Sequence, residues 1–503
     1  MMHHEAITYQ QNPAVNLPPE LLSTVFLYAL RNYGHICPQH ISPAEISSMR
    51  RARLNISAVC VRWREVALST QVLWSIATFP PLVSTSQLSF NASTRDASSS
   101  EAANDIDGVS RFVMSIFDDE VSRAGNCTLS LHIIDLNPLR ALGRSPIPIP
   151  PSLTEKCFRI IEELLPHCKH LEVTGDTKLI HRLLCLPGPT HSPLPCPALQ
   201  SLSVSTWPDH GARHMSSVLD LSWAKHLREL KLTNHVYKQR LGLKISSEAV
   251  LQRLEAVNML LQDIMTVLAQ SPHLEELYWE SSDHDVAVPQ TPVHMPCVIH
   301  LILYGPNMPY LLRTLDAPQL ERLEIHSPWG SVDNFLPSPP PKPCQFPRLR
   351  VFILFMPLML FDSSESAFGR FIQVHSNLQV IRLQHGWIAG SFIESLSALP
   401  SLRHVSTQYR SLHEDIGPMA LLQAWYAKAS LGPADSPLPT LYVRGGTLSK
   451  KIQLLEPSEF SEFARNVVVS SPLIASGLRG AEYWDEIFHA LDRGEGLRRF
   501  INA

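Results

Sequence analysis

Residues 274–279 read Leu-Glu-Glu-Leu-Tyr-Trp, with apolar side chains at the first, fourth and sixth positions. Clear copies of this pattern occupy residues 199–204, 227–232, 320–325 and 378–383. Weaker copies begin at Cys168, Leu251, Val298, Leu349, Leu402 and Leu438. Successive copies start 22 to 36 residues apart, and many follow a proline, as at Pro197, Pro272, Pro318, Pro347 and Pro400. One such match arises by chance in any leucine-rich chain, but a series at similar spacing predicts a structural repeat.

The spacing within each copy predicts one strand per repeat, followed by a helix or loop that returns to the next strand. Apolar positions one, four and six then point inward, and the residues between them face the solvent on the concave side. The repeat length resembles that of leucine-rich repeats, which implies an α/β fold with an irregular solenoid over residues 109–456. The asparagine expected near the end of each strand in that family is mostly missing, and Asn234 is the nearest candidate.

The segments that flank the repeats have a different composition. Residues 81–108 are rich in Ser, Asn, Asp and Ala and contain few large apolar residues, which favours a flexible linker. The repeat pattern fades from about Gly445, and apolar residues in 457–503 recur at helical spacing. We therefore expect a C-terminal helical cap that covers the last repeat.

Residues 14–80 contain two stretches with helical periodicity. The first opens with Leu17-Pro18-Pro19-Glu20-Leu21-Leu22 and carries a stripe made of Leu17, Leu21, Leu22, Val25, Phe26 and Leu30. The second carries Ile56, Val59, Cys60, Trp63, Val66 and Ala67. Ser42-Pro43-Ala44-Glu45 is a capping box, and no Gly or Pro interrupts residues 44–79, which predicts a long second helix. Such stripes are most often ordinary core, but about sixty residues bury little, so part of this surface is available to a partner.

Three elements of this segment resemble the F-box of divergent fungal F-box proteins. They are Leu-Pro-Pro-Glu-Leu-Leu at residues 17–22, Val-Cys-Val-Arg-Trp-Arg at 59–64 and Leu-Trp at 73–74, in that order. The resemblance implies a small helical bundle that packs on a Skp-type adaptor of a cullin ligase. It places Leu17, Pro18, Leu21, Leu22, Val25 and Phe26 against the adaptor, while Cys60 and Trp63 hold the bundle together or touch the adaptor's edge. The segment from Arg31 to Arg53 is longer than in the compact form of the motif.

Composition excludes several classes of partner. Charge is nearly balanced, with 42 basic and 46 acidic residues and no basic tract, which argues against nucleic-acid binding. No apolar run approaches the roughly 18 residues of a membrane span, and residues 1–16 lack the apolar core of a signal peptide. The nine cysteines are scattered and form no Cys-x-x-Cys pair. We therefore expect an intracellular protein, in the cytoplasm or nucleus, that binds neither membrane nor nucleic acid.

No motif for catalysis or for a cofactor is present. The chain has no phosphate-binding loop, no Gly-x-Gly-x-x-Gly and no Gly-x-Ser-x-Gly. His210 with His214, and the run His167-Cys168-Lys169-His170, offer too few side chains for a metal site, which needs three or four converging ligands. We expect no metal, no cofactor and no enzymatic activity, although an unrecognised active site stays open as an alternative.

The combined features favour the substrate-recognition subunit of a Skp-cullin-F-box type ubiquitin ligase. In this hypothesis the N-terminal helices bind the adaptor, and the solenoid binds a target protein whose identity the sequence does not reveal. The strand residues expected to face the target are Lys231, Tyr278, Glu324 and Arg382. The alternative is a repeat-based scaffold that never joins a ligase, in which the N-terminal helices only cap the repeats.

Overall fold

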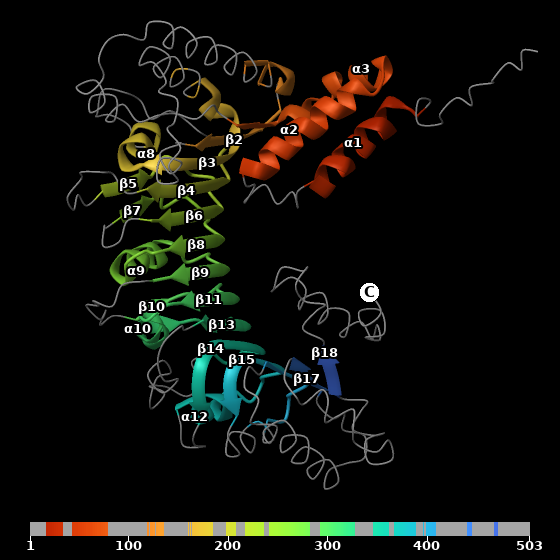
Figure 1. Cartoon of the computed structure of the whole chain (residues 1–503). Coiled ribbons are helices and arrows are strands. Elements are labelled where there is room, and N and C mark those ends of the chain that lie inside the picture. The colour runs from red at the N-terminus through yellow and green to blue at the C-terminus, as the bar shows by residue number, and fades with distance from the viewer. Residues whose placement is uncertain are drawn as a thin grey trace, which may run out of the picture. The chain divides into compact units, whose positions relative to one another are not determined.

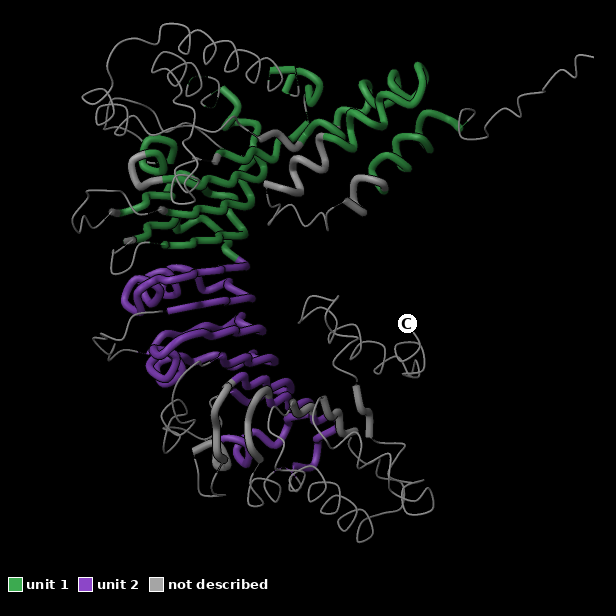
Figure 2. The backbone as a smooth tube through the Cα atoms, viewed as in Figure 1, with its two compact units in different colours: residues 1–251 green, residues 252–503 purple. Residues whose placement is uncertain are grey.

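The computed structural model describes residues 17–33, 43–78, 118–119, 121–125, 127–134, 159, 161, 163–184, 198–207, 217–235, 241–281, 292–326, 346–361, 367–388, 396, 399–408, 440–444 and 467–470. The chain divides into two compact units, residues 1–251 and residues 252–503 (Figure 2). Each unit combines helices with parallel strands, so the predicted α/β class is confirmed.

Unit 1 begins with helices α1 (Pro19–Tyr33), α2 (Pro43–Ala58) and α3 (Val61–Ser69), which lie beside one another (Figure 1). Helix α2 begins at Pro43, as the capping box predicts. The prediction of one uninterrupted helix beyond it is wrong, because Cys60 is extended (φ −159°, ψ 170°) and starts α3 as its N-cap. A short 3-10 helix, η2 (Gln71–Trp74), follows α3.

The remaining elements of unit 1 are built around parallel strands. Neighbouring strands pair in the order β1 (Ile76–Thr78), β2 (Leu129–Ile134), β3 (Cys168–Asp176), β4 (Ser201–Trp207) and β6 (Glu229–Asn234). A separate parallel pair joins β5 (Ser217–Leu221) to β7 (Leu241–Ile245). The short helices are η3 (Leu165–His167) and α8 (Thr177–Leu184). Strand β1 lies inside the segment that the sequence assigns to the helical domain, so that segment also supplies a strand.

Unit 2 repeats the arrangement over more strands. Neighbours pair in parallel in the order β8 (Arg253–Val257), β9 (Glu276–Glu280), β11 (His300–Tyr304), β13 (Arg322–His326), β14 (Val351–Phe361), β15 (Val380–Ile388), β16 (His404–Gln408), β17 (Thr440–Arg444) and β18 (Val467–Ser470). A short pair joins β10 (Val293–His294) to β12 (Leu315–Asp316). The helices are α9 (Leu261–Gln270), α10 (Met308–Thr314) and α12 (Ala367–Val374), and α9 and α10 lie on the same side of the strands (Figure 1).

Every predicted copy of the repeat supplies a strand, which begins at its third residue except in the first copy, where β3 begins at Cys168 itself. The inward positions are confirmed: Leu274, Leu277 and Trp279 are buried, and so are the matching residues of the other copies whose side chains the structure describes. Residues at equal positions stand in register, as Leu277, Leu301 and Leu323 do across β9, β11 and β13. Each fully buried leucine contributes about 1.5–3 kcal/mol relative to an exposed one, so the stacked rows form the main core.

The prolines before the strands have a specific role. Pro272, Pro318 and Pro347 each occupy the second position of a four-residue turn whose fourth residue is the first apolar residue of a copy. The turns close through the amide-to-carbonyl hydrogen bonds Leu274–Ser271, Leu320–Ala317 and Leu349–Phe346, at 3.2, 3.2 and 3.1 Å. Proline suits this position because its ring fixes φ near the value that the turn needs.

Two of the predicted flanking segments fall mostly outside the described residues. Linker 81–108 lies outside them entirely. Within 457–503 the structure describes Val467–Ser470, which is strand β18, paired with β17. The prediction of helix is wrong for these residues, because a run of three β-branched valines favours a strand.

Candidate protein-interaction sites

Most of the residues predicted to bind partners lie on two surfaces. The first surface is formed by α1, α2 and α3. Helix α1 and the residues just before it contact α3 and its C-cap at three points. The Arg62 guanidinium Nη2 donates to the Leu17 carbonyl at 2.7 Å, and the hydroxyls of Ser23 and Thr70 are 2.9 Å apart. The rings of Phe26 and Trp63 pack with their centroids 5.1 Å apart. The first two of the three elements that resemble the F-box are therefore in direct contact.

The apolar stripe of α1 divides into two rows. Leu22 and Phe26, four residues apart, are 0% and 1% exposed and form the core between the helices. Leu21 and Val25, also four residues apart, are 52% and 46% exposed. The expectation that all of these residues face a partner is wrong for Leu22 and Phe26, because the chain itself buries them. Of the other two predicted contacts, Leu17 is half-buried and Pro18 is exposed.

Cys60 and Trp63 serve the structure of this helical segment. The Cys60 thiol sulfur accepts a hydrogen bond from the Trp63 amide at 3.4 Å, which caps the first turn of α3. The Trp63 ring then contacts Phe26. Of the two roles that the resemblance leaves open, this geometry favours holding the helices together.

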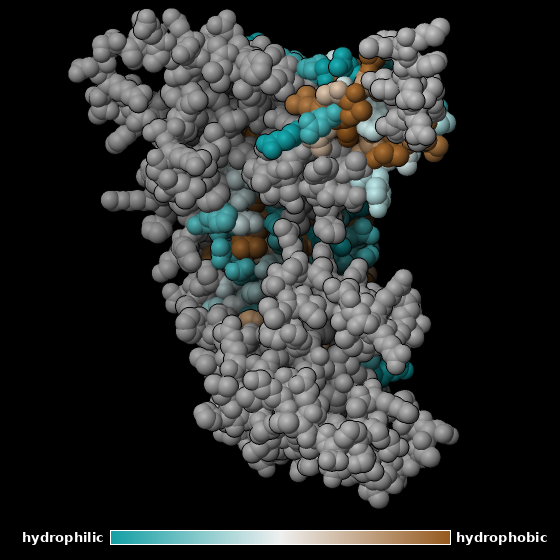
Figure 3. All heavy atoms as spheres, turned by 45° about the vertical axis from the view of Figure 1, so that its right-hand side comes forward, coloured by the Kyte–Doolittle hydropathy of each residue, from teal (hydrophilic) through white to brown (hydrophobic). Residues whose placement is uncertain are grey.

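An exposed apolar patch remains on the three helices. It comprises Leu21, Val25 and Tyr28 on α1, Leu54 on α2, Val61 and Leu68 on α3, and Val59 just before α3. Figure 3 shows apolar side chains gathered on this helical part of unit 1. Soluble proteins seldom expose so many large apolar side chains together unless a partner covers them. The predicted stripes did not include Tyr28, Leu54, Val61 and Leu68, because the exposure of these side chains depends on how the helices pack.

The second surface is the solvent-facing side of strands β9, β11, β13 and β14 in unit 2. Four rings form a continuous row across these strands. The centroids of Tyr278 and Tyr304 are 5.2 Å apart, those of Tyr304 and His326 are 4.1 Å apart, and those of His326 and Phe355 are 5.4 Å apart. Each of the four side chains is half-buried, so the row is partly open to solvent. We call Tyr278, Tyr304, His326 and Phe355 the aromatic row.

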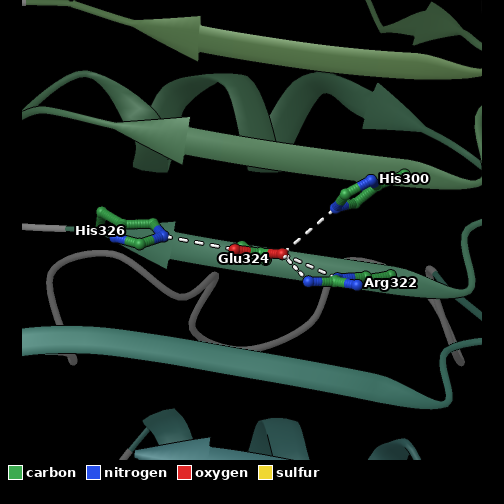
Figure 4. Close-up of polar contacts among 4 residues, drawn as sticks. All are labelled: His300, Arg322, Glu324 and His326. Carbon is green, nitrogen blue, oxygen red and sulfur yellow. Dashed lines mark hydrogen bonds and ion pairs between the residues drawn. The ribbon is translucent and has the colours of Figure 1, made fainter. Parts of the chain in front are cut away.

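A charged cluster lies beside the aromatic row, centred on Glu324 (Figure 4). Its Oε1 accepts from Arg322 Nε at 2.7 Å and lies 3.3 Å from His300 Nε2, while Oε2 lies 3.5 Å from His326 Nε2. Burial alone raises the pKa of Glu324. The hydrogen bonds from both histidines and the charge of Arg322 outweigh burial and hold the pKa well below the ordinary 4.5. Glu324 is therefore ionised at physiological pH, and its oxygens are paired with Arg322 and the two histidines.

This arrangement makes the stability of the protein depend on pH. A carboxyl group whose pKa is lowered by folding stabilises the fold above its unfolded pKa, and the contribution is lost as the pH falls. We expect Glu324→Gln to be less stable than wild type at pH 7, and the difference to shrink as the pH falls below 4.5. Melting temperatures from calorimetry at pH 7, 5, 4 and 3 measure this difference in stability.

The control for this prediction is Glu248→Gln, which removes an exposed ion pair with Lys225. Exposed pairs contribute little, so this variant should follow wild type at every pH. If the loss of stability caused by Glu324→Gln stays constant from pH 7 to pH 3, the lowered pKa of Glu324 does not contribute to stability.

At the Tyr278 end of the aromatic row, the nearby charged group is Glu280. Its Oε2 accepts a hydrogen bond from the Tyr278 hydroxyl at 3.1 Å. Burial and the negative charge of Glu280 raise the pKa of Tyr278. Burial and the charges of Glu324 and Glu280 raise the pKa of Tyr304 to about 12. Both phenols therefore stay protonated at physiological pH and lie in a negative electrostatic field.

The predicted target-facing residues fall in different places. Tyr278, Glu324 and Arg382 stand at one level of unit 2, in register through Ile302 and Ile353. Tyr278 is half-buried, but Glu324 and Arg382 are only 6% and 8% exposed, so the expectation of solvent exposure is wrong for these two. Glu324 is covered in part by its contacts with His300, Arg322 and His326. Lys231 lies in unit 1 on β6, half-buried and in register with Ser203 of β4.

Sequence reasoning missed Glu280, Tyr304, His326 and Phe355. Each follows the sixth position of its copy directly, so all four share the seventh position. Comparison of that position across consecutive copies is the signal that finds them, because equal positions stand side by side in a parallel ladder.

The metal-binding candidates are only partly within the described residues. Cys168 is buried and begins β3, while His210 and His214 lie outside the described residues. In the part of the chain that the structure describes, no three His, Cys, Asp or Glu side chains are grouped closely enough to hold a metal ion. None of the described helices has the length and apolar character needed to cross a membrane.

Comparison of the sequence with models of known protein families gives no match, and comparison with characterised proteins gives none either.

Proposed function

We propose that this protein is the substrate-recognition subunit of a Skp-cullin-F-box type ubiquitin ligase and acts in the cytoplasm or nucleus. The observation that carries the proposal is the exposed apolar patch on α1, α2 and α3, within the segment that resembles the F-box. Leu21 and Val25 belong to this patch and are more than two-fifths exposed, while the neighbouring Leu22 and Phe26 are buried between the helices. A rigid helical platform with an apolar outer face suits a permanent docking partner.

The repeated strands supply the other half of the proposed role. We interpret them as an irregular leucine-rich-repeat solenoid, with one strand and one return segment per repeat. Register between neighbours supports this interpretation, because equal positions of successive copies form continuous rows of side chains. Such rows offer an extended surface to a target protein.

A receptor of this kind needs no catalytic groups of its own. Ubiquitin transfer would take place on other subunits, and the receptor would raise the effective concentration of the target beside them. The competing function is a scaffold that never joins a ligase. Such a scaffold would not bind an adaptor.

Adaptor binding therefore tests the proposal. A recombinant fungal Skp-type adaptor should co-purify with the full chain, and the double variant Leu21→Asp, Val25→Asp should abolish this. Burial of each apolar side chain is worth about 1.5–3 kcal/mol, so the loss in affinity should exceed a hundredfold. Isothermal titration calorimetry gives the affinities.

The matched control is Val250→Asp, because Val250 is 47% exposed but lies outside the three helices. This variant should bind the adaptor like wild type. Failure of wild type to bind, or equal loss in the control, eliminates the receptor function and leaves the scaffold.

A further inference from the structure

We infer that Tyr278, Tyr304 and Glu280 form a site for a lysine or arginine side chain, presented by an extended basic segment of a partner protein. This inference rests on the proposed function only in regarding that partner as the target for ubiquitin transfer. We call these three residues the cation site.

The geometry of the rings is the first support. The ring centroids of Tyr278 on β9 and Tyr304 on β11 lie 5.2 Å apart, and the rings are tilted by 36°. His326 stacks on one face of Tyr304 at 4.1 Å, so the cation site uses the Tyr278 ring and the part of Tyr304 that the tilt leaves uncovered. Both side chains are half-buried. A cation held within about 6 Å of such ring faces is attracted by the π electrons, and partial removal of water strengthens the attraction.

The position of the carboxylate is the second support. Glu280 stands in register with Tyr304, and its Oε2 binds the Tyr278 hydroxyl at 3.1 Å, so one carboxylate flanks both phenols. Among the described residues Glu280 forms no ion pair. A carboxylate that accepts only one neutral hydroxyl keeps the capacity to accept further hydrogen bonds from a cation.

The charges around the cation site agree with a basic ligand. Glu255, Glu280 and Glu324 are the charged groups that act on the two phenols, and all three are acidic. Arg322 forms an ion pair with Glu324, and Arg253 on the neighbouring strand pairs with Glu276 at 2.6 Å. The net field at the rings is therefore negative, which suits a cation and disfavours an acidic or phosphorylated segment.

The remainder of the aromatic row explains why the ligand should be an extended segment. His326 and Phe355 continue the row across the next two strands. Neighbouring strands are about 4.8 Å apart. A peptide that crosses the strands from the cation site thus meets rings at each step, with its basic residue over β9 and β11 and apolar residues beyond.

Peptide binding by the full chain tests the inference. Four fluorescent peptides of equal length carry Lys, Arg, Glu or uncharged Gln at one position, followed by two apolar residues. The Lys and Arg peptides should bind at least fivefold more tightly than the Gln peptide, and the Glu peptide should bind most weakly. Fluorescence anisotropy measures the dissociation constants.

The variants locate the binding. Glu280→Gln and Tyr304→Leu should each lower the affinity for the Lys peptide about five- to tenfold. Tyr304→Phe keeps the ring, and its affinity for the Lys peptide should stay within twofold of that of wild type. Asp316→Asn is the charge control, since it removes one carboxylate of unit 2 from an exposed pair with His294 outside the aromatic row, and it should have no effect. Melting temperatures verify that each variant is folded.

The results of these measurements test the cation site and the proposed function separately. No binding of any peptide, tighter binding of the Glu peptide, or basic-peptide binding unchanged by both Glu280→Gln and Tyr304→Leu overturns the cation site. Adaptor affinity is measured on the same samples. Adaptor binding without peptide binding defeats this inference and keeps the proposed function, whereas the reverse result keeps the cation site and removes the ligase.

Discussion

Replacement of Trp279 by alanine is expected to lower the free energy of unfolding of unit 2 by about 3–5 kcal/mol. Trp279 occupies the sixth position of its copy and is the largest of the fully buried side chains in the described residues. Its indole Nε1 donates to the Met259 carbonyl at 3.1 Å, which ties β9 to the residues that precede α9. Alanine leaves a cavity and an unpaired buried carbonyl, and both are costly.

Urea unfolding of the full chain, with hydrogen exchange followed by mass spectrometry to assign the change to unit 2, measures this effect. Trp279→Phe is the companion variant. It retains most of the apolar bulk but loses the indole N–H, so its cost should be clearly smaller than that of alanine. A loss below about 1 kcal/mol for Trp279→Ala would show that the packing around β9 is loose.

A comparable loss is expected from Gly305→Ala. Gly305 directly follows β11 with φ at +99°, a conformation that residues with a side chain rarely adopt. An added Cβ would lie 1.8 Å from the carbonyl oxygen of Ser281, which directly follows β9. That oxygen belongs to the backbone and cannot rotate away, so the strand ends must separate. Backbone strain and overpacking together suggest a cost of about 3–5 kcal/mol.

Gly125→Ala provides the control, because Gly125 also has a positive φ, at +56°. There the added Cβ meets the amide end of the Gln71 side chain, which can move. Its expected cost is about 1–2 kcal/mol, from the left-handed conformation alone. The difference between the two alanine variants in thermal unfolding isolates the backbone clash at Gly305. Equal losses would mean that the two strand ends tolerate separation.

Sequence periodicity predicted the strands because burial at three positions of each copy leaves a direct trace in residue type. Leu274, Leu277 and Trp279 belong to the core in any structure that repeats this pattern. The break at Cys60 leaves no such trace, because a thiol in place of Ser or Asp is an uncommon N-cap. Strand β18 was missed because the prediction for 457–503 followed the helical spacing of apolar residues and passed over the strand preference of three consecutive valines.

The candidate sites were harder to predict than the core. Whether Glu324 is open or covered depends in part on His300 of β11, which comes from another copy of the repeat. Likewise, Leu21 and Leu22 are adjacent and equally apolar, and only the position of α3 makes one a surface residue and the other a core residue. Properties that depend on neighbours distant in sequence cannot be inferred from one element at a time.

The equal register of β9, β11 and β13 has an evolutionary consequence. Loss of one complete copy, such as residues 298–319, would bring Leu277 level with Leu323 and keep the core rows matched. The same event would delete Tyr304 and place His326 beside Tyr278. Gain or loss of whole copies would therefore change the rings of the aromatic row in a single genetic step, while the buried rows stay matched.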